Sequence, residues 1–315
     1  MVNLVADKEF PKPHQEKIMK TYIVTGATRG LGLEIARALA ASVETTVVLA
    51  VRDVARGQAV ARELGSHVEV RKLDLGSLAD VKRFAREWTG PLAGLVNNAG
   101  VQETTETKRT ADGLESTIAT NHIAAFALTA ALLPALDGGR VLFIGSGTHN
   151  PETAAKAFGF RGGRFTSIAE LARGDTDEPD VKQANRDRYA TSKMLNTMTA
   201  MEWARRMPAI TFLTLDPGLM AGTGLARHQS LPLRIVWSTV LRVVAPLLPD
   251  TSTTKRSGRA AAWLMTDPSL LAHSGEVYSF DRKPSRQVWE KARDPKLMAA
   301  VIDQTEAFLL HSFAA

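Results

Sequence analysis

The sequence predicts a single α/β domain, a doubly wound parallel sheet of about seven strands with helices on both faces. Two observations predict it. Short β-branched segments alternate with helical segments along the chain, without an internal repeat or a composition shift that would mark a second domain. The first of these strands also runs directly into a glycine-rich turn that opens a helix. We therefore expect an N-terminal arm, 1–19, and one domain, 20–315.

Composition excludes several classes of chemistry. The chain has 315 residues and no cysteine, so disulfides, thiol nucleophiles, thiolate metal sites and iron–sulfur clusters are excluded, and we expect no metal. The formal net charge of +6 is spread along the chain, so we expect no nucleic-acid partner. No apolar stretch reaches the roughly 18–20 residues that span a bilayer, and the first 20 residues lack a signal-peptide core. We expect a cytoplasmic protein.

The glycine-rich turn indicates a nucleotide site. A strand, Thr21–Thr25, ends in Thr25-Gly26-Ala27-Thr28-Arg29-Gly30-Leu31-Gly32, and a helix follows from Leu31 to Ala41. Glycines at this spacing allow a tight turn and let backbone N–H groups approach a pyrophosphate at the helix N-terminus.

The end of the second strand indicates which dinucleotide binds. Thr45–Ala50 is followed by Val51-Arg52-Asp53, at the position that meets the adenosine ribose. A guanidinium favours a 2′-phosphate, and Arg29 offers a second cation. Asp53 leaves NAD open, but the two arginines favour NADP(H).

The next two strands contribute candidate binding residues. Val68–Leu73 ends in Asp74-Leu75, where Asp74 is either a turn residue or faces the adenine; Ser77 and Asp80 then resemble a capping box for a helix at 78–88. Leu92–Val96 precedes Asn97-Asn98-Ala99-Gly100, which is either turn chemistry or support for the nicotinamide half of the site.

Two polar residues stand out in the following helix and strand. A long helix, Leu114–Leu136, contains Asn121, which requires a hydrogen-bond partner in an apolar helix. A fifth strand, Val141–Gly145, delivers Ser146 at its carboxyl end, where open α/β sheets bind ligands.

Tyr189-Ala190-Thr191-Ser192-Lys193 carries the predicted acid/base chemistry. Tyr189 and Lys193 lie one helical turn apart on one face, and the ammonium should lower the pKa of the phenol towards neutral pH. The helix is expected to run to about Arg206, after an irregular stretch, 147–188, that is too long for an ordinary connection.

The C-terminal part completes the sheet and the predicted substrate pocket. A sixth strand, Ile210–Leu215, leads into Asp216-Pro217-Gly218, and 231–249 is apolar. That segment is a buried helix, an apolar lid over the pocket or an interfacial membrane contact. A helix at 254–266, a last strand at 276–280 and an amphipathic helix at 295–311 follow.

Taken together, the glycine turn, Asn97-Asn98-Ala99-Gly100, Asn121, Ser146, Tyr189-x-x-x-Lys193 and Pro217-Gly218 resemble the short-chain dehydrogenase/reductase family over residues 20–282. The resemblance implies a Rossmann fold with a C-terminal substrate lid. It implies that Tyr189 is the acid/base, Ser146 binds the substrate oxygen, Lys193 holds the ribose and lowers the tyrosine pKa, and Asn121 holds a proton-relay water. The expected cofactor contacts are Gly26, Thr28, Arg29, Gly30, Leu31, Gly32, Arg52, Asp53, Asp74, Leu75, Asn98, Ala99, Gly100, Tyr189, Lys193, Pro217, Gly218 and Thr223.

Within the family the chain is similar to the retinol dehydrogenase and protochlorophyllide reductase branch, through its long segment after Ser146, the stretch 217–225 and Asp267-Pro268-Ser269-Leu270. Protochlorophyllide reductases carry a cysteine shortly after Pro-Gly, where this chain has Leu219. The resemblance implies NADPH-dependent reduction of a carbonyl in a bulky hydrophobic small molecule, or oxidation of the matching alcohol. Segments 147–188 and 219–250 would shape the pocket. Reduction of a conjugated C=C bond and a non-catalytic NADP(H)-sensing module are the alternatives. A homodimer and a weak peripheral membrane contact stay open.

Overall fold

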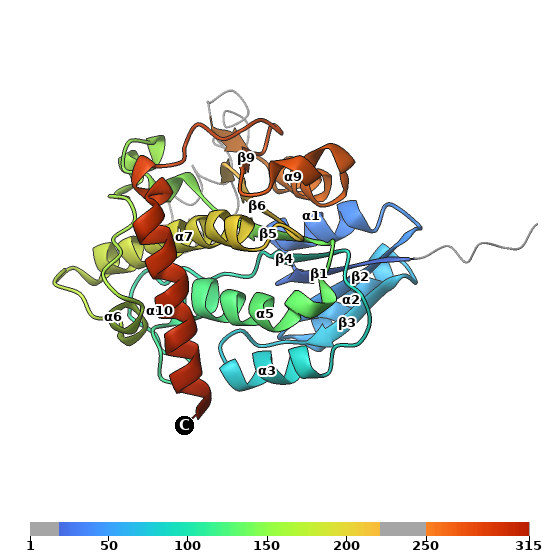
Figure 1. Cartoon of the computed structure of the whole chain (residues 1–315), viewed down its shortest axis with the longest axis horizontal. Coiled ribbons are helices and arrows are strands. Elements are labelled where there is room, and N and C mark those ends of the chain that lie inside the picture. Colours follow the sequence, from blue (N-terminus) through green and yellow to red (C-terminus); the bar gives the residue numbers. More distant parts are fainter. Residues whose placement is uncertain (1–18, 221–249, 315) are drawn as a thin grey trace, which may run out of the picture.

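The strands of the main sheet all run parallel, in the order β3-β2-β1-β4-β5-β6-β9 (Figure 1). The structure is a computed structural model, and it describes residues 19–220 and 250–314. This order is that of a doubly wound sheet, so the predicted fold class is confirmed. The strands are β1 (Lys20–Thr25), β2 (Thr45–Val51), β3 (Val68–Lys72), β4 (Gly94–Asn97), β5 (Arg140–Ile144), β6 (Thr211–Asp216) and β9 (Val277–Ser279).

Helices cover both faces of this sheet, because successive side chains of each buried strand point to opposite faces. Along β1, Ile23 packs into one hydrophobic cluster while Tyr22 and Val24 pack into the other. The first face carries α3 (Leu78–Arg86), α5 (Ala124–Leu132), α7 (Val181–Arg206) and α10 (Pro295–Ala314). The second face carries α1 (Gly30–Leu39), α2 (Val54–Leu64) and α9 (Thr254–Thr266).

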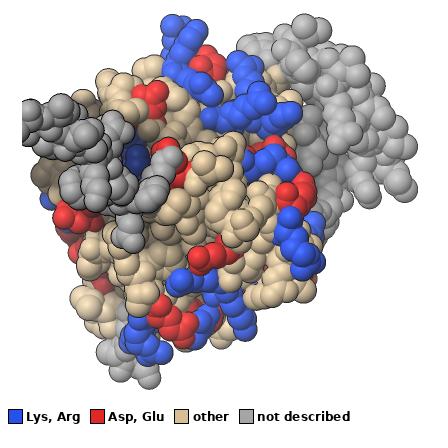
Figure 2. Space-filling model, turned by 90° about the vertical axis from the view of Figure 1, so that its right-hand side faces the viewer, with Lys and Arg blue, Asp and Glu red and all other residues tan. Residues whose placement is uncertain are grey.

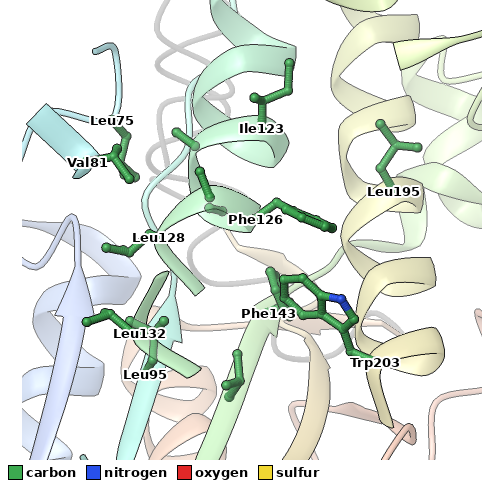
Figure 3. Packing of buried hydrophobic residues seen from close by; sticks show 14 of the residues in the cluster. Leu75, Val81, Leu95, Ile123, Phe126, Leu128, Leu132, Phe143, Leu195 and Trp203 are labelled. Carbon is green, nitrogen blue, oxygen red and sulfur yellow. The ribbon is translucent and has the colours of Figure 1, made fainter. Parts of the chain in front are cut away.

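Trp203 organises the core of the first face. It is 2% exposed and lies against Phe126 of α5, with the ring centroids 4.4 Å apart (Figure 3). Phe143 of β5 and Phe212 of β6 lie 6.2 and 5.6 Å from the same indole. Such offset aromatic contacts stabilise the packing beyond the area that they bury. The last turns of α7 are thereby fixed to the sheet.

The predicted helix at 114–136 is interrupted. It consists of α4 (Ser116–Ile118), a π-helical turn (Ala119–Ile123), α5 and a 3₁₀ turn (Leu133–Ala135). In the π-helical turn, the N–H of Ala124 bonds the carbonyl of Ala119, five residues earlier. Such single turns frequently occur at functional sites. Here the turn contains Asn121.

The stretch 147–188 is less irregular than its composition suggests. It contains 3₁₀ turns at Gly147–His149 and Ala154–Phe158 and a short helix, α6 (Ile168–Arg173). The helix that contains Tyr189 also begins earlier than predicted, at Val181, because Asp180 caps it by accepting from Lys182 N. Tyr189 therefore lies in the third turn of α7.

One expectation about apolar segments is wrong. Ser116–Ala135 is long and apolar enough to cross a membrane, with a mean hydropathy of 1.4, and 67% of it is buried inside the fold. It packs between α3 and α7 as a core element (Figure 1). Several predictions lie outside the described residues: the arm up to residue 18, Thr223, and the segment 231–249.

A second parallel sheet, of two strands, pairs the residues just before and just after 221–249. Its strands are β7 (Leu219–Met220) and β8 (Thr251–Ser252), and Leu219 N donates to Asp250 O at 2.8 Å. Met220 and Asp250, the described residues on either side of 221–249, therefore lie close together, next to the end of β6.

Candidate active site

The strand order reverses between β1 and β4, and ligands of doubly wound sheets bind at this reversal, beyond the carboxyl ends of the strands. The glycine turn after β1 therefore lies beside Asn98-Ala99-Gly100 after β4. The fit between the two is close. A Cβ on Gly26 would lie 2.9 Å from Ala99 Cα, and one on Gly32 would lie 2.4 Å from Asn98 Nδ2 and 2.6 Å from Gly26 O. Both positions require glycine for space.

Asn98 and Thr25 join the two turns by hydrogen bonds. The Asn98 carboxamide donates to Thr25 O at 2.8 Å, and Thr25 Oγ1 accepts from Asn98 N at 3.0 Å and Ala99 N at 2.9 Å. Asn98 thus acts on the predicted nucleotide site by fixing the glycine turn.

The N-terminus of α1 has the features of an anion site. Its N-cap residue, Arg29, makes no side-chain capping hydrogen bond, so the first N–H groups of the helix have no such partner. Gly30 is exposed with a φ of +60°, and a Cβ built there meets nothing within 4 Å. The residues present therefore fit the pyrophosphate of a dinucleotide.

At the end of β2, the two candidate ribose-binding residues have different roles. Asp53 caps α2, with Oδ1 accepting from Arg56 N at 2.9 Å. Arg52 is exposed, and neither Arg52 nor Arg29 forms an ion pair within residues 19–220 and 250–314. The carboxylate is used locally, whereas both guanidinium groups remain accessible to a phosphate.

After β3, Asp74 is used as a turn residue. Its Oδ1 accepts from Gly76 N at 2.9 Å, and Leu75 behind it is buried. The capping box at Ser77 forms in part: Ser77 Oγ accepts from Asp80 N at 3.3 Å, but the Asp80 carboxylate accepts from Asp74 N instead of Ser77 N.

The side chain of Asn121 is fully engaged. Oδ1 accepts from Val101 N at 2.7 Å, and Nδ2 donates to Val101 O at 2.9 Å and to Ser192 Oγ at 3.1 Å. Both amide protons are used, so the carboxamide joins the turn after β4 to α7. A water held by this residue would be bound by its main-chain carbonyl, which already accepts from Asn196 Nδ2 at 2.9 Å.

Ser146 lies at the start of a 3₁₀ turn. Its Oγ accepts from Thr148 N at 3.3 Å, which leaves the hydroxyl proton for a ligand. The main-chain carbonyl oxygen of Ser146 lies 2.5 Å from His149 Nδ1, and His149 Nε2 accepts from Trp289 N at 3.2 Å. Because Nε2 accepts, we assign the proton of the neutral ring to Nδ1. Burial lowers the pKa of His149, which keeps the ring neutral.

Tyr189 and Lys193 lie together, with Lys193 Nζ 5.6 Å from the centre of the Tyr189 ring. Lys193 Nζ donates to Ile144 O at 2.9 Å, which ties α7 to the end of β5. The Tyr189 hydroxyl has no hydrogen-bond partner in the part of the chain that the structure describes.

The predicted lowering of the Tyr189 pKa by Lys193 is wrong for this structure. Burial, with a contribution from Asp216, raises the pKa of Tyr189 to about 12. Burial also lowers the pKa of Lys193 to about 8. In this low-dielectric site, desolvation of each charged form outweighs the attraction between them. At neutral pH the phenol therefore keeps its proton.

Asp216 is a site residue that the sequence did not reveal as one. It ends β6, is 5% exposed, and its Oδ1 accepts from Gly218 N at 3.1 Å. It also accepts from the backbone of Gly147, directly after Ser146. Burial raises the pKa of Asp216 to about 6. Gly218 has a φ of +70°, and Pro217 O accepts from Ser257 Oγ at 2.8 Å, so this turn is fixed on both sides.

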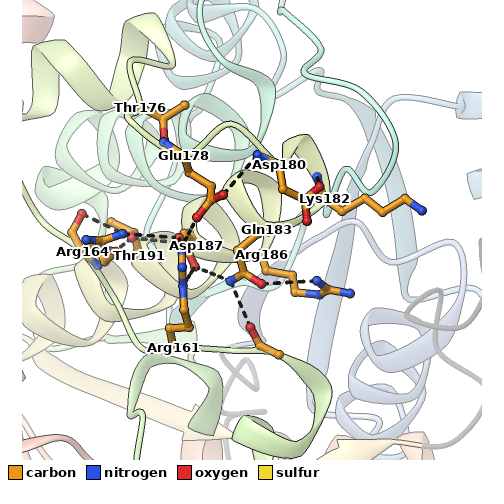
Figure 4. A network of polar contacts seen from close by, with 11 residues as sticks. Arg161, Arg164, Thr176, Glu178, Asp180, Lys182, Gln183, Arg186, Asp187 and Thr191 are labelled. Atoms are coloured by element: carbon orange, nitrogen blue, oxygen red, sulfur yellow. Dashed lines mark hydrogen bonds and ion pairs between the residues drawn. The ribbon is translucent and has the colours of Figure 1, made fainter.

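A second wall of the site comes from 158–164. Phe160 is 4% exposed, and its ring lies 6.1 Å from that of Tyr189. The segment is held on α7 by the ion pair of Arg161 with Asp187, whose Oδ1 also accepts from Gln183 Nε2 at 2.8 Å (Figure 4). Arg161 also pairs with Glu178 at 2.8 Å. An apolar side chain therefore faces the candidate acid/base.

The structure thus gathers those predicted residues that it describes at one edge of the sheet, and Asp216, Phe160 and Ser192 join them. Ser192 could have been found from the sequence by one signal, polar residues at helical spacing within a buried segment. Ser192 and Asn196 show this pattern, since they flank Lys193 within one turn of α7. A cavity of about 540 Å³ lies at the opposite edge, between Lys20, Tyr22 and Trp263, far from these residues. On the face shown in Figure 2, basic and acidic side chains are interspersed.

The fold and this arrangement define a nucleotide-dependent oxidoreductase, and comparisons with known proteins agree. The short chain dehydrogenase family model matches residues 20–157. The chain belongs to the short-chain dehydrogenase/reductase family. It is 33% identical to the chloroplastic protochlorophyllide reductase of Pisum sativum over 310 residues, covering 85% of this chain and 75% of that protein. Identity to the Chlamydomonas reinhardtii enzyme is 31%, covering 88% and 76%.

Solved structures agree with the fold. An uncharacterised protein from Mycobacterium paratuberculosis, 28% identical, has a TM-score of 0.66 over 91% of this chain and 92% of its own. A 3-ketoacyl-(acyl-carrier-protein) reductase from Brucella melitensis, complexed with NADH, has a TM-score of 0.57 at 20% identity, over 82% and 96%. The resemblance to the protochlorophyllide reductase branch is therefore confirmed.

Proposed function

We propose that this protein is an NADPH-dependent reductase that acts on a carbonyl group of a bulky hydrophobic small molecule. The observation that carries the proposal is the protonated Tyr189 hydroxyl. It has no partner among the described residues and lies beside Lys193, at the edge of the sheet that Ser146 shares. Because its pKa is raised to about 12, the phenol carries its proton at neutral pH and is available to donate it.

The nicotinamide would supply the hydride to the carbonyl carbon. Tyr189 would donate its proton to the carbonyl oxygen, and the free Ser146 hydroxyl would donate a hydrogen bond to the same oxygen. Lys193 is charged at pH 7, because its pKa is about 8, and its ammonium would stabilise the phenolate left behind. Asn121 would hold a proton-relay water by its main-chain carbonyl.

NADP(H) is the cofactor that the charges favour. Arg29 and Arg52 present accessible guanidinium groups at the ribose end of the site, and the Asp53 carboxylate is used in capping α2. The remaining predicted contacts, from Gly26 to Gly218, line the same edge of the sheet.

The polarity of the substrate is inferred from the second wall of the site, the segment 158–164. Phe160 places an apolar ring beside Tyr189, so the group next to the reacting carbonyl would be apolar. A second candidate reaction is reduction of a conjugated C=C bond. Identity of 31–33% to protochlorophyllide reductases favours it, but the chain has no cysteine, which counts against the same photochemistry.

The first test is titration of the protein with NADPH and with NADH, followed by tryptophan fluorescence. We expect tighter binding of NADPH, and Arg52→Ala should weaken NADPH binding about tenfold, on the order of 1.4 kcal/mol, while leaving NADH unchanged. An equal loss of affinity for NADPH and for NADH would contradict the assignment of Arg52 to the 2′-phosphate.

The second test is turnover. The protein would be screened with NADPH against aromatic and isoprenoid ketones, aldehydes and enones, and products would be identified by mass spectrometry and NMR. An alcohol supports the carbonyl reaction, and a saturated ketone supports the second candidate. Tyr189→Phe should lower kcat by about 10³-fold with unchanged NADPH affinity. Wild-type-like turnover by this variant would overturn the role of Tyr189.

A further inference from the structure

A chain of buried hydrogen bonds joins the C-terminal helix to the π-helical turn of Asn121. Asn196 Nδ2, on α7, donates to Asn121 O at 2.9 Å. Asn196 Oδ1 lies 3.2 Å from His122 Nδ1, and His122 Nε2 lies 3.2 Å from Thr305 Oγ1 on α10. The three linking side chains are at most 2% exposed. None of them belongs to the predicted site.

The protons in this chain can be assigned from its chemistry. Asn196 must direct its NH₂ group at Asn121 O, so it presents its oxygen to His122. A carboxamide oxygen only accepts, so His122 Nδ1 must carry the proton. His122 Nε2 is then an acceptor, and the single proton of the Thr305 hydroxyl is shared between Val301 O at 2.6 Å and His122 Nε2 at 3.2 Å.

The opposite tautomer of His122, with the proton on Nε2, would place the lone pairs of Nδ1 and Asn196 Oδ1 against each other. With the proton on Nε2, Thr305 would donate to Val301 O at 2.6 Å, and the bare Nδ1 would face Asn196 Oδ1. Turning Asn196 over would relieve this contact but would place its oxygen against Asn121 O. Protonation of Nδ1 therefore satisfies His122, Asn196 and Asn121 O, with the Thr305 hydroxyl placed to donate to both Val301 O and His122 Nε2. Burial lowers the pKa of His122 to about 4, so the ring stays neutral at physiological pH.

We propose that Thr305, His122 and Asn196 are positioning residues that make the C-terminal helix part of the catalytic apparatus by orienting the main-chain carbonyl of Asn121. This inference rests on the proposed function. Both amide protons of the Asn121 carboxamide are used by Val101 and Ser192, and its Oδ1 accepts from Val101 N, so we assign the contact with a ligand or water to its main-chain carbonyl. Asn121 lies in the π-helical turn, where the backbone ladder departs from the i→i−4 pattern, and Asn196 Nδ2 donates to its carbonyl from the neighbouring helix.

The hydrogen-bond chain is tested without any substrate. The full-length protein would be labelled with ¹⁵N-histidine, and the His122 ring identified as the resonance that Thr305→Val shifts. We expect a neutral ring with the proton on Nδ1 from pH 5.5 to 8. A ring protonated on Nε2, or one that becomes charged above pH 6, would overturn the chain.

The effect on catalysis is tested with matched threonine variants. Thr305→Val removes the donor to His122, and Thr305→Ser restores it. Thr199→Val is the control, since Thr199 is fully buried on α7 and its hydroxyl has no partner among the described residues. We expect Thr305→Val to lower kcat five- to tenfold with NADPH affinity within twofold of wild type, and Thr305→Ser and Thr199→Val to retain kcat.

Asn196→Leu, which removes the donor to Asn121 O, should lower kcat by about a hundredfold. Equal kcat for Thr305→Val and Thr199→Val would overturn the positioning role, as would a loss in Thr305→Val that Thr305→Ser does not restore. A folded wild type that reduces no carbonyl and no enone would overturn the proposed function instead, and the histidine spectrum would still decide the chain.

Discussion

The nucleotide half and the substrate half of the site are built in different ways. Around Gly26, Gly32 and Asn98, backbone meets backbone so closely that an added methyl group has no space. Around Arg161 and Asp187, long side chains hold a segment onto α7 by ion pairs and hydrogen bonds (Figure 4). The first half depends on the absence of side chains, and the second depends on particular ones.

This difference separates what is fixed from what can vary. A turn packed through glycine admits one geometry, as the recognition of a constant pyrophosphate requires. A segment held by side chains can be repacked by changing them, as the recognition of different substrates requires. Four variants test this contrast.

Gly32→Ala should have the largest effect. The new Cβ would lie 2.4 Å from Asn98 Nδ2 and 2.6 Å from Gly26 O, so the glycine turn must move. We expect NADPH affinity to fall at least a hundredfold, roughly 2.7 kcal/mol, measured by fluorescence titration. Retention of tight binding would show that this half is more adaptable than its packing indicates.

Asp216→Asn tests the boundary between the two halves of the site. There the Asp216 carboxylate accepts hydrogen bonds from the backbone N–H groups of both Gly147 and Gly218. The pKa of Asp216 is raised to about 6, so its protonated form stabilises the fold at low pH. This contribution is complete below about pH 4 and is lost as pH rises through 6, by roughly 3 kcal/mol. Relative to Asp216→Asn, the wild type should lose that amount between pH 4 and 7 in urea unfolding. A difference that is independent of pH would refute the assignment.

Gly163→Ala is the substrate-half counterpart of Gly32→Ala. Its Cβ would lie 2.7 Å from Met194 Sδ and 2.8 Å from Met194 Cβ, beside Lys193. We expect kcat/KM to fall about tenfold with NADPH affinity unchanged, measured by steady-state kinetics alongside the same titration. An equal loss of nucleotide affinity would mean that the two halves are mechanically coupled.

Asp187→Asn should have the smallest effect. Its carboxylate is 11% exposed but its partner Arg161 is 45% exposed, so solvent screens the pair. We expect the free energy of unfolding to fall by about 1 kcal/mol and KM for the substrate to rise a few-fold, with NADPH affinity unchanged. A drop in NADPH affinity of the same size would contradict the separation of the halves.

The same contrast explains what the sequence could and could not predict. The glycine turn, Asn98, Ser146 and Tyr189-x-x-x-Lys193 were predictable because short local patterns encode them. The doubly wound parallel sheet also followed from the alternation of strands and helices. The bounds of the strands moved by one or two residues, and the helix at 254–266 was predicted to the residue.

The remainder depends on contacts between distant parts of the chain. The pKa of Tyr189 is set by burial and by Asp216, 27 positions away in sequence, which no local pattern reveals. The side chain of Asn121, in the π-helical turn, is bonded to Val101 and Ser192, which are distant in sequence. The early start of α7 at Val181 is the exception, because it follows from the local cap Asp180. Phe160 reaches Tyr189 only because Arg161 is held on α7.

The small sheet of β7 and β8 has a consequence for how such proteins diversify. Because Leu219 and Thr251 are paired, the two ends of the intervening segment are held together whatever its length or composition. Insertion, deletion or exchange of that segment between relatives would leave the register of the main sheet untouched. For protein engineering, Met220 and Asp250 are therefore a defined pair of junctions at which that segment can be exchanged.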